Sequence, residues 1–287
     1  MQRLNLGCGF DKRDGYLNVD LQDFHDPDLV ADVRELGALA SDAYEEVLAI
    51  DVLEHLPRSD TDICLSEWHR LLQPGGTIVL QVPDVVACGR HLLATDDIAE
   101  HHKWVHQLWG TQAYTGDFHL AGFTDLTVID ALDRAGFHRI GIETVDGWML
   151  AVTAEKAPAD GPRHPLAVGF GTGFHGPEGD DAGRWRWSEG DATLLLHNTS
   201  DAPIGVALAA GLELPGVRRG AVRITAAGGH DESVRIGRGR HDWRADLTLE
   251  PGPTRVRFRT DATPLRAPDD ARTLVVMHAE PSVTLLP

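Results

Sequence analysis

The sequence has no apolar run long enough to cross a membrane. Its longest runs, such as residues 77–82 and 193–196, fall far short of the ~18–20 residues that a membrane helix needs. The first residues lead directly into a strand-like pattern, with no apolar core behind a basic stretch as in a secretory signal. We therefore expect no membrane span and a cytoplasmic protein.

Cysteine is also scarce. Cys8, Cys64 and Cys88 are an odd number of residues at unrelated spacings, all in the first third of the chain. This pattern suits neither a disulfide framework nor a zinc site. We expect three free thiols.

Basic residues are also few, and they are scarce relative to acidic residues only in residues 1–156. Residues 1–156 contain 27 acidic and 11 basic residues, whereas residues 157–287 contain 17 and 15, which together give the net charge of −18. A protein that binds nucleic acid needs a cationic surface to displace counterions from the phosphates. We therefore expect no nucleic-acid partner.

The length of 287 residues predicts two domains. A stretch rich in proline and glycine, residues 157–165, is typical of a linker. We place a first domain at residues 1–156 and a second at residues 166–287.

The first domain alternates short apolar runs with helical patterns, which predicts an α/β fold with a parallel sheet. Strands are expected at residues 4–6, 16–21, 29–31, 47–50 and 77–82, and helices at 59–72 and 125–135. Asp146-Gly147 between two further strand patterns, 139–145 and 148–155, indicates a hairpin, so the last strand should be antiparallel. Residues 84–122 show no clear strand and are a candidate lid.

The second domain is predicted to be an all-β sandwich. Short alternating segments are separated by turns and no long helical pattern occurs. The expected strands are residues 184–187, 193–197, 204–208, 221–225, 233–236, 245–249, 254–259 and 273–278.

The residues that indicate chemistry follow successive strands of the first domain. Gly7 and Gly9 follow the first strand, and Asp20, Asp32 and Asp51 follow the next three. Ligands of open α/β sheets bind at the carboxyl ends of the strands, where glycines allow close approach and carboxylates accept hydrogen bonds. Only residues 8–15 separate the first two strands, so the usual first helix should be absent or a single turn.

In these residues the chain resembles the class I S-adenosylmethionine-dependent methyltransferases. The resemblance rests on five motifs in order, which are Leu6-Gly7-Cys8-Gly9, Asn18-Val19-Asp20, Glu54-His55-Leu56, Glu67 with Arg70, and residues 72–76, Leu-Gln-Pro-Gly-Gly. It implies a Rossmann-like sheet and S-adenosylmethionine as the cofactor. It also implies that Gly7 and Gly9 line the methionine end, Asp20 binds the ribose, Asp32 the adenine amino group, and Asp51 forms the floor.

An acceptor hydroxyl would call for a base, and histidine is the obvious one. The candidates are His55 and His119, each of which has an alternative structural or orienting role. In the lid, Gln112, Asp117, Trp104 and Trp109 would form the acceptor pocket, with core packing as the alternative for both tryptophans. No carboxylate pattern accompanies His101-His102, so we expect a metal-free reaction.

Residues 173–198, with Glu178, Trp185, Trp187 and Ser188, resemble a small β domain found beside enzymes of polysaccharide and cell-surface glycan assembly. The two tryptophans share one strand face, where they either pack in the core or stack on a sugar. The preferred hypothesis is O-methylation of a sugar or glycan precursor. The alternatives are methylation of another small metabolite, or a non-catalytic binding module in glycan assembly. The oligomeric state does not follow from the sequence.

Overall fold

The computed structural model describes residues 2–114, 116–158, 161–181 and 183–287. Two compact units are present: unit 1 is Met1–Ile142 with Asp146–His164, and unit 2 is Glu143–Val145 with Pro165–Pro287. Ala159 and Asp160 of the predicted linker, and Thr115 of the predicted lid, lie outside the described residues. The predicted domain limits remain a prediction.

Unit 1 is built on a mixed sheet with the strand order β3-β2-β1-β4-β5-β7-β6. The strands β1, β2, β3, β4 and β5 are parallel, and β7 is antiparallel to β5. Asp146 and Gly147, both with positive φ, form the turn of the β6–β7 hairpin. The strand bounds are β1 (Gln2–Leu6), β2 (Tyr16–Asp20), β3 (Leu29–Val30), β4 (Tyr44–Ile50), β5 (Leu72–Pro83), β6 (Phe137–Val145) and β7 (Met149–Lys156).

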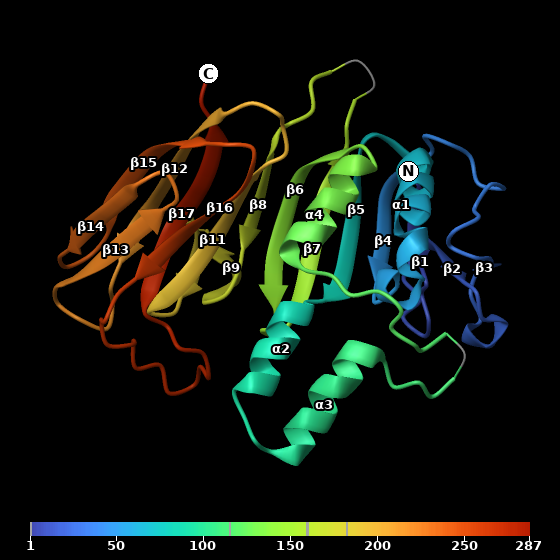
Figure 1. Cartoon of the computed structure of the whole chain (residues 1–287), viewed down its shortest axis with the longest axis horizontal. Helices are drawn as coiled ribbons and strands as arrows, with labels where there is room; N and C mark the ends of the chain where they lie inside the picture. The colour runs from blue at the N-terminus through green and yellow to red at the C-terminus, as the bar shows by residue number, and fades with distance from the viewer. Residues whose placement is uncertain (1, 115, 159–160, 182) are drawn as a thin grey trace. The chain divides into compact units, whose positions relative to one another are not determined.

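Four α-helices accompany this sheet: α1 (Thr61–Leu71), α2 (Val85–Leu93), α3 (Ile98–Trp109) and α4 (Asp125–Arg134). Figure 1 shows α1 and α4 lying over the strands, and α2 and α3 beyond the end of β5. The predicted lid therefore contains two helices. His101, His102 and His106 indicate a helix face in the sequence and lie on α3, whereas α2 was not predicted. Within the described ranges, no helix is both long enough and apolar enough to span a membrane.

Side-chain parity along β5 explains which face of the sheet carries the core. Ile78, Leu80 and Val82 are fully buried, whereas the alternate residues Thr77 and Val79 are only partly buried. Trp68 of α1 is also fully buried, and its indole Nε1 donates to the carbonyl of Val33 at 2.9 Å. Apolar contact on one face thus fixes α1 against the sheet.

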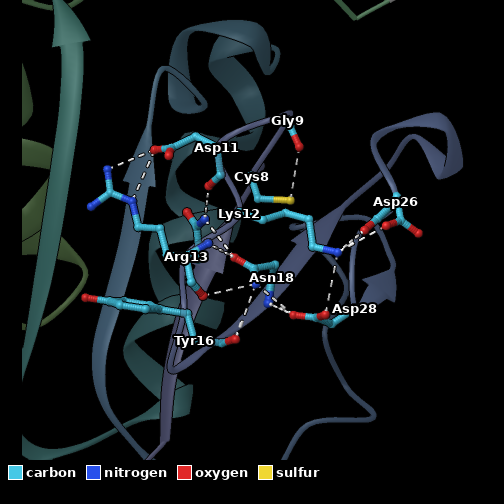
Figure 2. A network of polar contacts seen from close by, with 10 residues as sticks. Cys8, Gly9, Asp11, Lys12, Arg13, Tyr16, Asn18, Asp26 and Asp28 are labelled. Atoms are coloured by element: carbon cyan, nitrogen blue, oxygen red, sulfur yellow. Dashed lines mark hydrogen bonds and ion pairs between the residues drawn. The ribbon is translucent and has the colours of Figure 1, made fainter.

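The connection between β1 and β2 contains no helix, as the sequence predicts, and two buried asparagines hold it. Asn5 Nδ2 donates to Asn18 Oδ1 at 3.0 Å and to the carbonyl of Asp11 at 2.8 Å. The same Asn18 oxygen accepts from the backbone N–H of Arg13, and Asn18 Nδ2 donates to Asp28 (Figure 2). Side chains therefore provide the hydrogen bonds that a crossover helix would make within itself.

Two residues of the predicted linker belong to unit 1 and contact its α4 and β6. Arg163 forms an ion pair with Asp133, and the backbone N–H of His164 donates to His138 Nδ1 at 3.0 Å. The end of this segment is thus fixed to unit 1 by contacts that its composition does not predict.

Unit 2 is all-β in its described residues. Its strands form the arrays β14-β13-β16-β11-β8 and β15-β12-β17-β10-β9, and buried residues of both arrays belong to one core. The strands β8 and β9 were not predicted. The bounds are β8 (Leu166–Phe170), β9 (Phe174–Asp180), β10 (Gly183–Ser188), β11 (Asp191–Asn198), β12 (Ile204–Glu213), β13 (Gly220–Ala226), β14 (His230–Ile236), β15 (His241–Leu249), β16 (Gly252–Arg259) and β17 (Val276–Leu285).

A buried polar cluster lies inside unit 2. The Arg186 guanidinium pairs with both carboxylate oxygens of Glu143, at 2.5 and 2.7 Å. Ser188 Oγ lies 2.9 Å from His278 Nε2. Burial, and then the positive charge of Arg186, lower the pKa of His278 to about 3, so this imidazole is neutral in the folded protein.

The first prediction concerns the asparagine pair. Replacing Asn18 with alanine should lower the free energy of unfolding by about 1–3 kcal/mol, because Asn5 and the backbone of Arg13 lose their acceptor. Arg13→Ala is the control, since it removes an exposed side chain and keeps that backbone donor. Urea unfolding curves measure both. A midpoint for Asn18→Ala equal to that of the control would contradict the role of the pair.

The second prediction concerns His278. Between pH 6.5 and 3 the unfolded chain binds a proton at this residue and the folded protein does not, so stability falls as the pH falls. Between pH 7 and 4.5 this loss should be about 2–3 kcal/mol. His278→Gln should flatten this pH dependence, and His241→Gln, at an exposed position of β15, should leave it unchanged. Equal slopes for all three proteins in urea unfolding would show that His278 is not the group responsible.

Candidate active site

A cavity of about 470 Å³ lies in unit 1 at the carboxyl ends of β1, β2 and β4. This volume is within the usual range for small-molecule sites, ~300–1,000 Å³. All five residues predicted to contact the cofactor are in its wall. The described residues that line it are Asn5, Gly7, Cys8, Gly9, Phe10, Asp11, Asp20, Leu21, Gln22, His25, Asp32, Val33, Arg34, Ile50, Asp51, Val52, His55, Leu56, Tyr114 and Gly116.

Gly7 and Gly9 form the part of the wall that follows β1. Both have left-handed backbone conformations, with φ of 62° and 49°. A Cβ on Gly7 would lie 2.6 Å from Cγ2 of Val52, which is too close for any side chain. A Cβ on Gly9 would meet nothing within 4 Å, so this glycine is required by its backbone conformation alone.

Asp20 is buried at the end of β2, and backbone donors hold its carboxylate. Oδ2 accepts from the N–H of Gly9 and Oδ1 from the N–H of Gln22, both at 2.8 Å. His25 Nδ1 lies 3.0 Å from Oδ1, and the His25 side chain is itself buried. A carboxylate has about four acceptor positions. Roughly one therefore remains for a ligand, fewer than the two ribose hydroxyls expected from the sequence.

Asp32 also has a protein partner. The Arg34 guanidinium contacts both of its oxygens, at 2.6–3.1 Å, and reaches Asp60 Oδ2 at 2.7 Å. This contact, more than any other, lowers the pKa of Asp32. An adenine amino group at this position would have to share the carboxylate with Arg34.

The charge of the cavity wall is negative. Asp11, Asp20, Asp32 and Asp51 contribute four carboxylates, and Arg34 is the single lysine or arginine among the described lining residues. Because Arg34 is already paired with two acids, its charge is largely neutralised. Such a wall favours a cationic ligand.

Asp51 and His55 form the side of the cavity that follows β4. Asp51 is held in a left-handed conformation with φ of 53°, and its backbone N–H donates to the carbonyl of Gln81 at 3.0 Å. Desolvation raises the pKa of Asp51. Burial lowers the pKa of His55, an effect that the charges of Asp117 and Asp51 oppose.

His55 and His119, the two predicted catalytic residues, lie side by side although 63 residues separate them. Their ring centroids are 4.7 Å apart with an edge-on angle of 84°. His119 is fixed by the end of α3, since its Nδ1 lies 3.0 Å from the carbonyl of Gln107 and its backbone N–H donates to Trp109. Burial and the neighbouring His55 lower the pKa of His119.

Glu54 joins this pair, and we call Glu54, His55 and His119 the Glu-His-His cluster. One potential ligand atom of each lies within 4.8 Å of the others. The Glu54 side chain is 1% exposed, and burial raises its pKa to about 8. The expectation of a metal-free site rested on the lack of a carboxylate pattern near His101-His102, which is a different region from this cluster.

The four predicted acceptor residues of the lid are absent from the described cavity wall. Trp104 is buried, stacked on His91 at 4.0 Å and edge-on to Trp148, so it packs between the lid and the β6–β7 hairpin. Trp109 is 58% exposed. Gln112 and Asp117 bond within their own loop, where the N–H of Gln112 donates to the carbonyl of Asp117 at 3.2 Å.

Tyr114 and Gly116 are the described lid residues that do reach the cavity. The Tyr114 ring lies edge-on to Phe24 with centroids 6.1 Å apart. Phe24 and Phe10 in turn contact the ring of His25 at 4.2 and 4.6 Å. An aromatic cluster therefore covers the side of the cavity near Asp20, and the lid contributes one ring to it.

Two functional candidates were missed at the level of sequence. His25 has no motif around it, and only the fold brings its ring to Asp20. Glu54 belongs to the quoted Glu54-His55-Leu56 motif, but its burial beside His119 depends on the position of α3. The sequence did contain one signal for Glu54, since it is an acid directly followed by His55 shortly after β4.

Comparison with protein-family models finds one match, which the model describes as a methyltransferase domain, over residues 4–80. The matched range includes all five predicted cofactor residues together with Glu54 and His55, and it ends before His119. It supports a methyltransferase assignment for unit 1, with S-adenosylmethionine as its cofactor. A search of curated proteins found no match.

Among solved structures, the chain is similar to a possible exported protein from Bordetella parapertussis, with 15% identity and a TM-score of 0.42, over 55% of this chain and 62% of that one. It is similar to a SAM-dependent methyltransferase from Archaeoglobus fulgidus, with 14% identity and a TM-score of 0.41, over 54% and 86%. A third is 1,6-didemethyltoxoflavin-N1-methyltransferase from Burkholderia thailandensis, solved with S-adenosylhomocysteine, with 16% identity and a TM-score of 0.38, over 55% and 71%.

Proposed function

We propose that unit 1 is an S-adenosylmethionine-dependent methyltransferase that methylates a hydroxyl group of a sugar or glycan precursor. The carrying observation is the acidic cavity at the carboxyl ends of β1, β2 and β4, within the range that matches a methyltransferase domain. Calorimetric titration with S-adenosylmethionine is the direct test. A chain that is folded and fails to bind the cofactor would exclude the proposal and favour a non-catalytic binding module.

The cavity fits this cofactor in charge and in shape. The net negative charge of the wall suits a sulfonium and an ammonium group, and the bare Cα of Gly9 leaves open space at the end of β1. Asp20 would accept from the ribose at its remaining position, and Asp32 would face the adenine. When bound, S-adenosylmethionine supplies a methyl group that bonds to the acceptor oxygen while the C–S electron pair stays on sulfur, and the hydroxyl proton must leave.

The acceptor would enter beside β4, where His55 is in the wall and His119 is behind it. Because a carbonyl can only accept, the His119 Nδ1 that faces the carbonyl of Gln107 carries the proton in the neutral ring. Its Nε2 is then an acceptor. This tautomer favours a role in holding or receiving the proton of a hydroxyl.

Unit 2 supports a glycan acceptor less directly. We propose that its two strand arrays form a β-sandwich like the small domains beside glycan-assembly enzymes. Trp187 is 8% exposed and belongs to the interior, whereas Trp185 is half-buried and its Nε1 donates to Glu178 Oε2 at 3.3 Å. Trp185 is thus the tryptophan of this pair that remains a candidate for sugar stacking. Methylation of another small metabolite is the second candidate.

The third prediction concerns cofactor binding. Asp20→Ala should weaken binding of S-adenosylmethionine by about 1–3 kcal/mol, because a charge-assisted hydrogen bond and the order of the Gly9 loop are both lost. Asp14→Ala is the control, because Asp14 is an exposed acid of the same loop and is not in the described cavity wall. Calorimetry gives both dissociation constants. Equal affinities for the two variants would remove Asp20 from the site.

The fourth prediction concerns His119. Its replacement by alanine should lower turnover by roughly 10²–10⁴-fold and leave cofactor affinity nearly unchanged. The assay is release of S-adenosylhomocysteine with a panel of sugar hydroxyl acceptors, and His102→Ala, on the exposed side of α3, is the control. If turnover stays near wild type, the assignment moves to His55. If melting temperature and cofactor affinity fall together with turnover, His119 is structural.

A further inference from the structure

The Glu54 carboxylate is the least explained polar group of unit 1. It is 1% exposed, and neither of its oxygens has a hydrogen-bond partner among the described residues. Burying a carboxyl group without partners is costly in either protonation state, because both oxygens lose their water. Native structures leave few such groups, and each calls for an explanation.

The neighbouring His55 also has a buried polar atom without a hydrogen-bond partner. Its Nδ1 is buried and also has no hydrogen-bond partner within the described ranges. With the Nδ1 of His119 held by the carbonyl of Gln107, the Nε2 of that ring is left with its lone pair. Three adjacent side chains therefore each offer a potential ligand atom, and the Glu54 oxygens and His55 Nδ1 have no hydrogen-bond partner among the described residues.

The cluster has the composition and the spacing of a metal site. Two imidazoles and one carboxylate are a common three-residue set for zinc and for other divalent first-row cations, with positions left open. With bonds of 2.0–2.1 Å, tetrahedral ligands lie about 3.4 Å apart. The ligand atoms of the cluster are within 4.8 Å of one another, so small rotations of the side chains would bring them together.

The surroundings of His119 match those of a metal ligand. Metal-binding histidines usually donate their other ring nitrogen to a carbonyl or a carboxylate, which fixes the tautomer and the ring orientation. His119 makes this contact with Gln107 at 3.0 Å. The carbonyl of Glu54 accepts from the N–H groups of Leu120 and Ala121, at 2.7 and 3.0 Å, so the backbone also ties the two halves of the cluster together.

We propose that Glu54, His55 and His119 bind a divalent transition-metal cation, for which Zn²⁺ is the probe. One cation would provide a partner for one ligand atom of each of the three residues. His55 belongs to the cavity wall, so the open positions of the cation would face the cavity.

The role of this cation rests on the proposed function. A cation there would bind the oxygen of the acceptor and lower the pKa of its hydroxyl, which releases the proton to water. His55 and His119 would then act as ligands, and the acceptor class narrows to oxygen donors that can reach a metal.

The test is Zn²⁺ binding to the full chain after dialysis against a chelator, followed by calorimetry and by metal analysis of the gel-filtered protein. We expect one equivalent, and Co²⁺ in its place should give visible absorption bands. Glu54→Gln keeps the shape of the side chain and removes the group that can ionise to bind the cation, and it should weaken Zn²⁺ binding by ~100-fold or more. His119→Gln, in a half-buried loop, is a second ligand variant and should behave in the same way.

His102→Gln is the matched control and should bind Zn²⁺ as wild type does, because His102 is an exposed histidine of α3. Less than one equivalent bound to wild type would overturn the proposal. It would also be overturned if both ligand variants, folded by circular dichroism, bind as tightly as the control, since Zn²⁺ would then be bound elsewhere.

Titration of the same proteins with S-adenosylmethionine separates this inference from the proposed function. Cofactor binding without Zn²⁺ binding overturns the metal site and leaves the methyltransferase proposal standing. Zn²⁺ binding that depends on Glu54, in a chain that does not bind the cofactor, supports the metal site and overturns the methyltransferase proposal. Asp20→Ala should weaken the binding of S-adenosylmethionine and leave the affinity for Zn²⁺ unchanged.

Discussion

The hydrogen bond between Asn5 and Asn18 is the interaction on which the geometry of unit 1 depends. Parallel strands are normally joined by a dozen or more residues, usually with a helix, whereas β1 and β2 are joined by residues 7–15. A connection this short makes few hydrogen bonds between its own backbone groups, such as Asp11 N–H to the carbonyl of Cys8 at 2.9 Å. The side chains of Asn5 and Asn18 bond to each other at 3.0 Å and also to backbone groups of this connection. Both side chains are buried.

The connection between β1 and β2 also fixes side chains of the cavity wall. The loop held by the asparagines presents the N–H of Gly9 to Asp20, which fixes the carboxylate before any ligand arrives. Arg34 does the same for Asp32. Preorganised groups lose little entropy on binding, but each protein contact occupies an acceptor position. The site thus combines rigid carboxylates with fewer free positions than the sequence suggests.

Features that depend on local chain chemistry were predictable. The parallel strands, the hairpin at Asp146-Gly147 and the cavity residues at strand ends follow from alternation, glycine and position along the chain. The helix expected at residues 59–72 begins two residues later, and β9 was missed because Gly176, Pro177 and Gly179 hide its alternation. The Glu-His-His cluster was beyond sequence reasoning, since the packing of α3 decides where His119 lies. Trp104 takes the core-packing alternative that the sequence left open, and the same packing of α3 decides this.

Hydrogen bonds connect residues of the predicted lid to the Glu-His-His cluster. The carbonyl of Glu54 holds the backbone at Leu120 and Ala121, and the end of α3 holds His119 through its ring and its backbone. Any movement of the lid that opens the acceptor side must therefore break contacts to Glu54 or separate His119 from His55. A ligand shared by the Glu54 carboxylate and His119 would hold residues 119–121 in the position that the backbone carbonyl of Glu54 already fixes. Binding at the proposed cation site would therefore favour the position of residues 119–121 that these hydrogen bonds define.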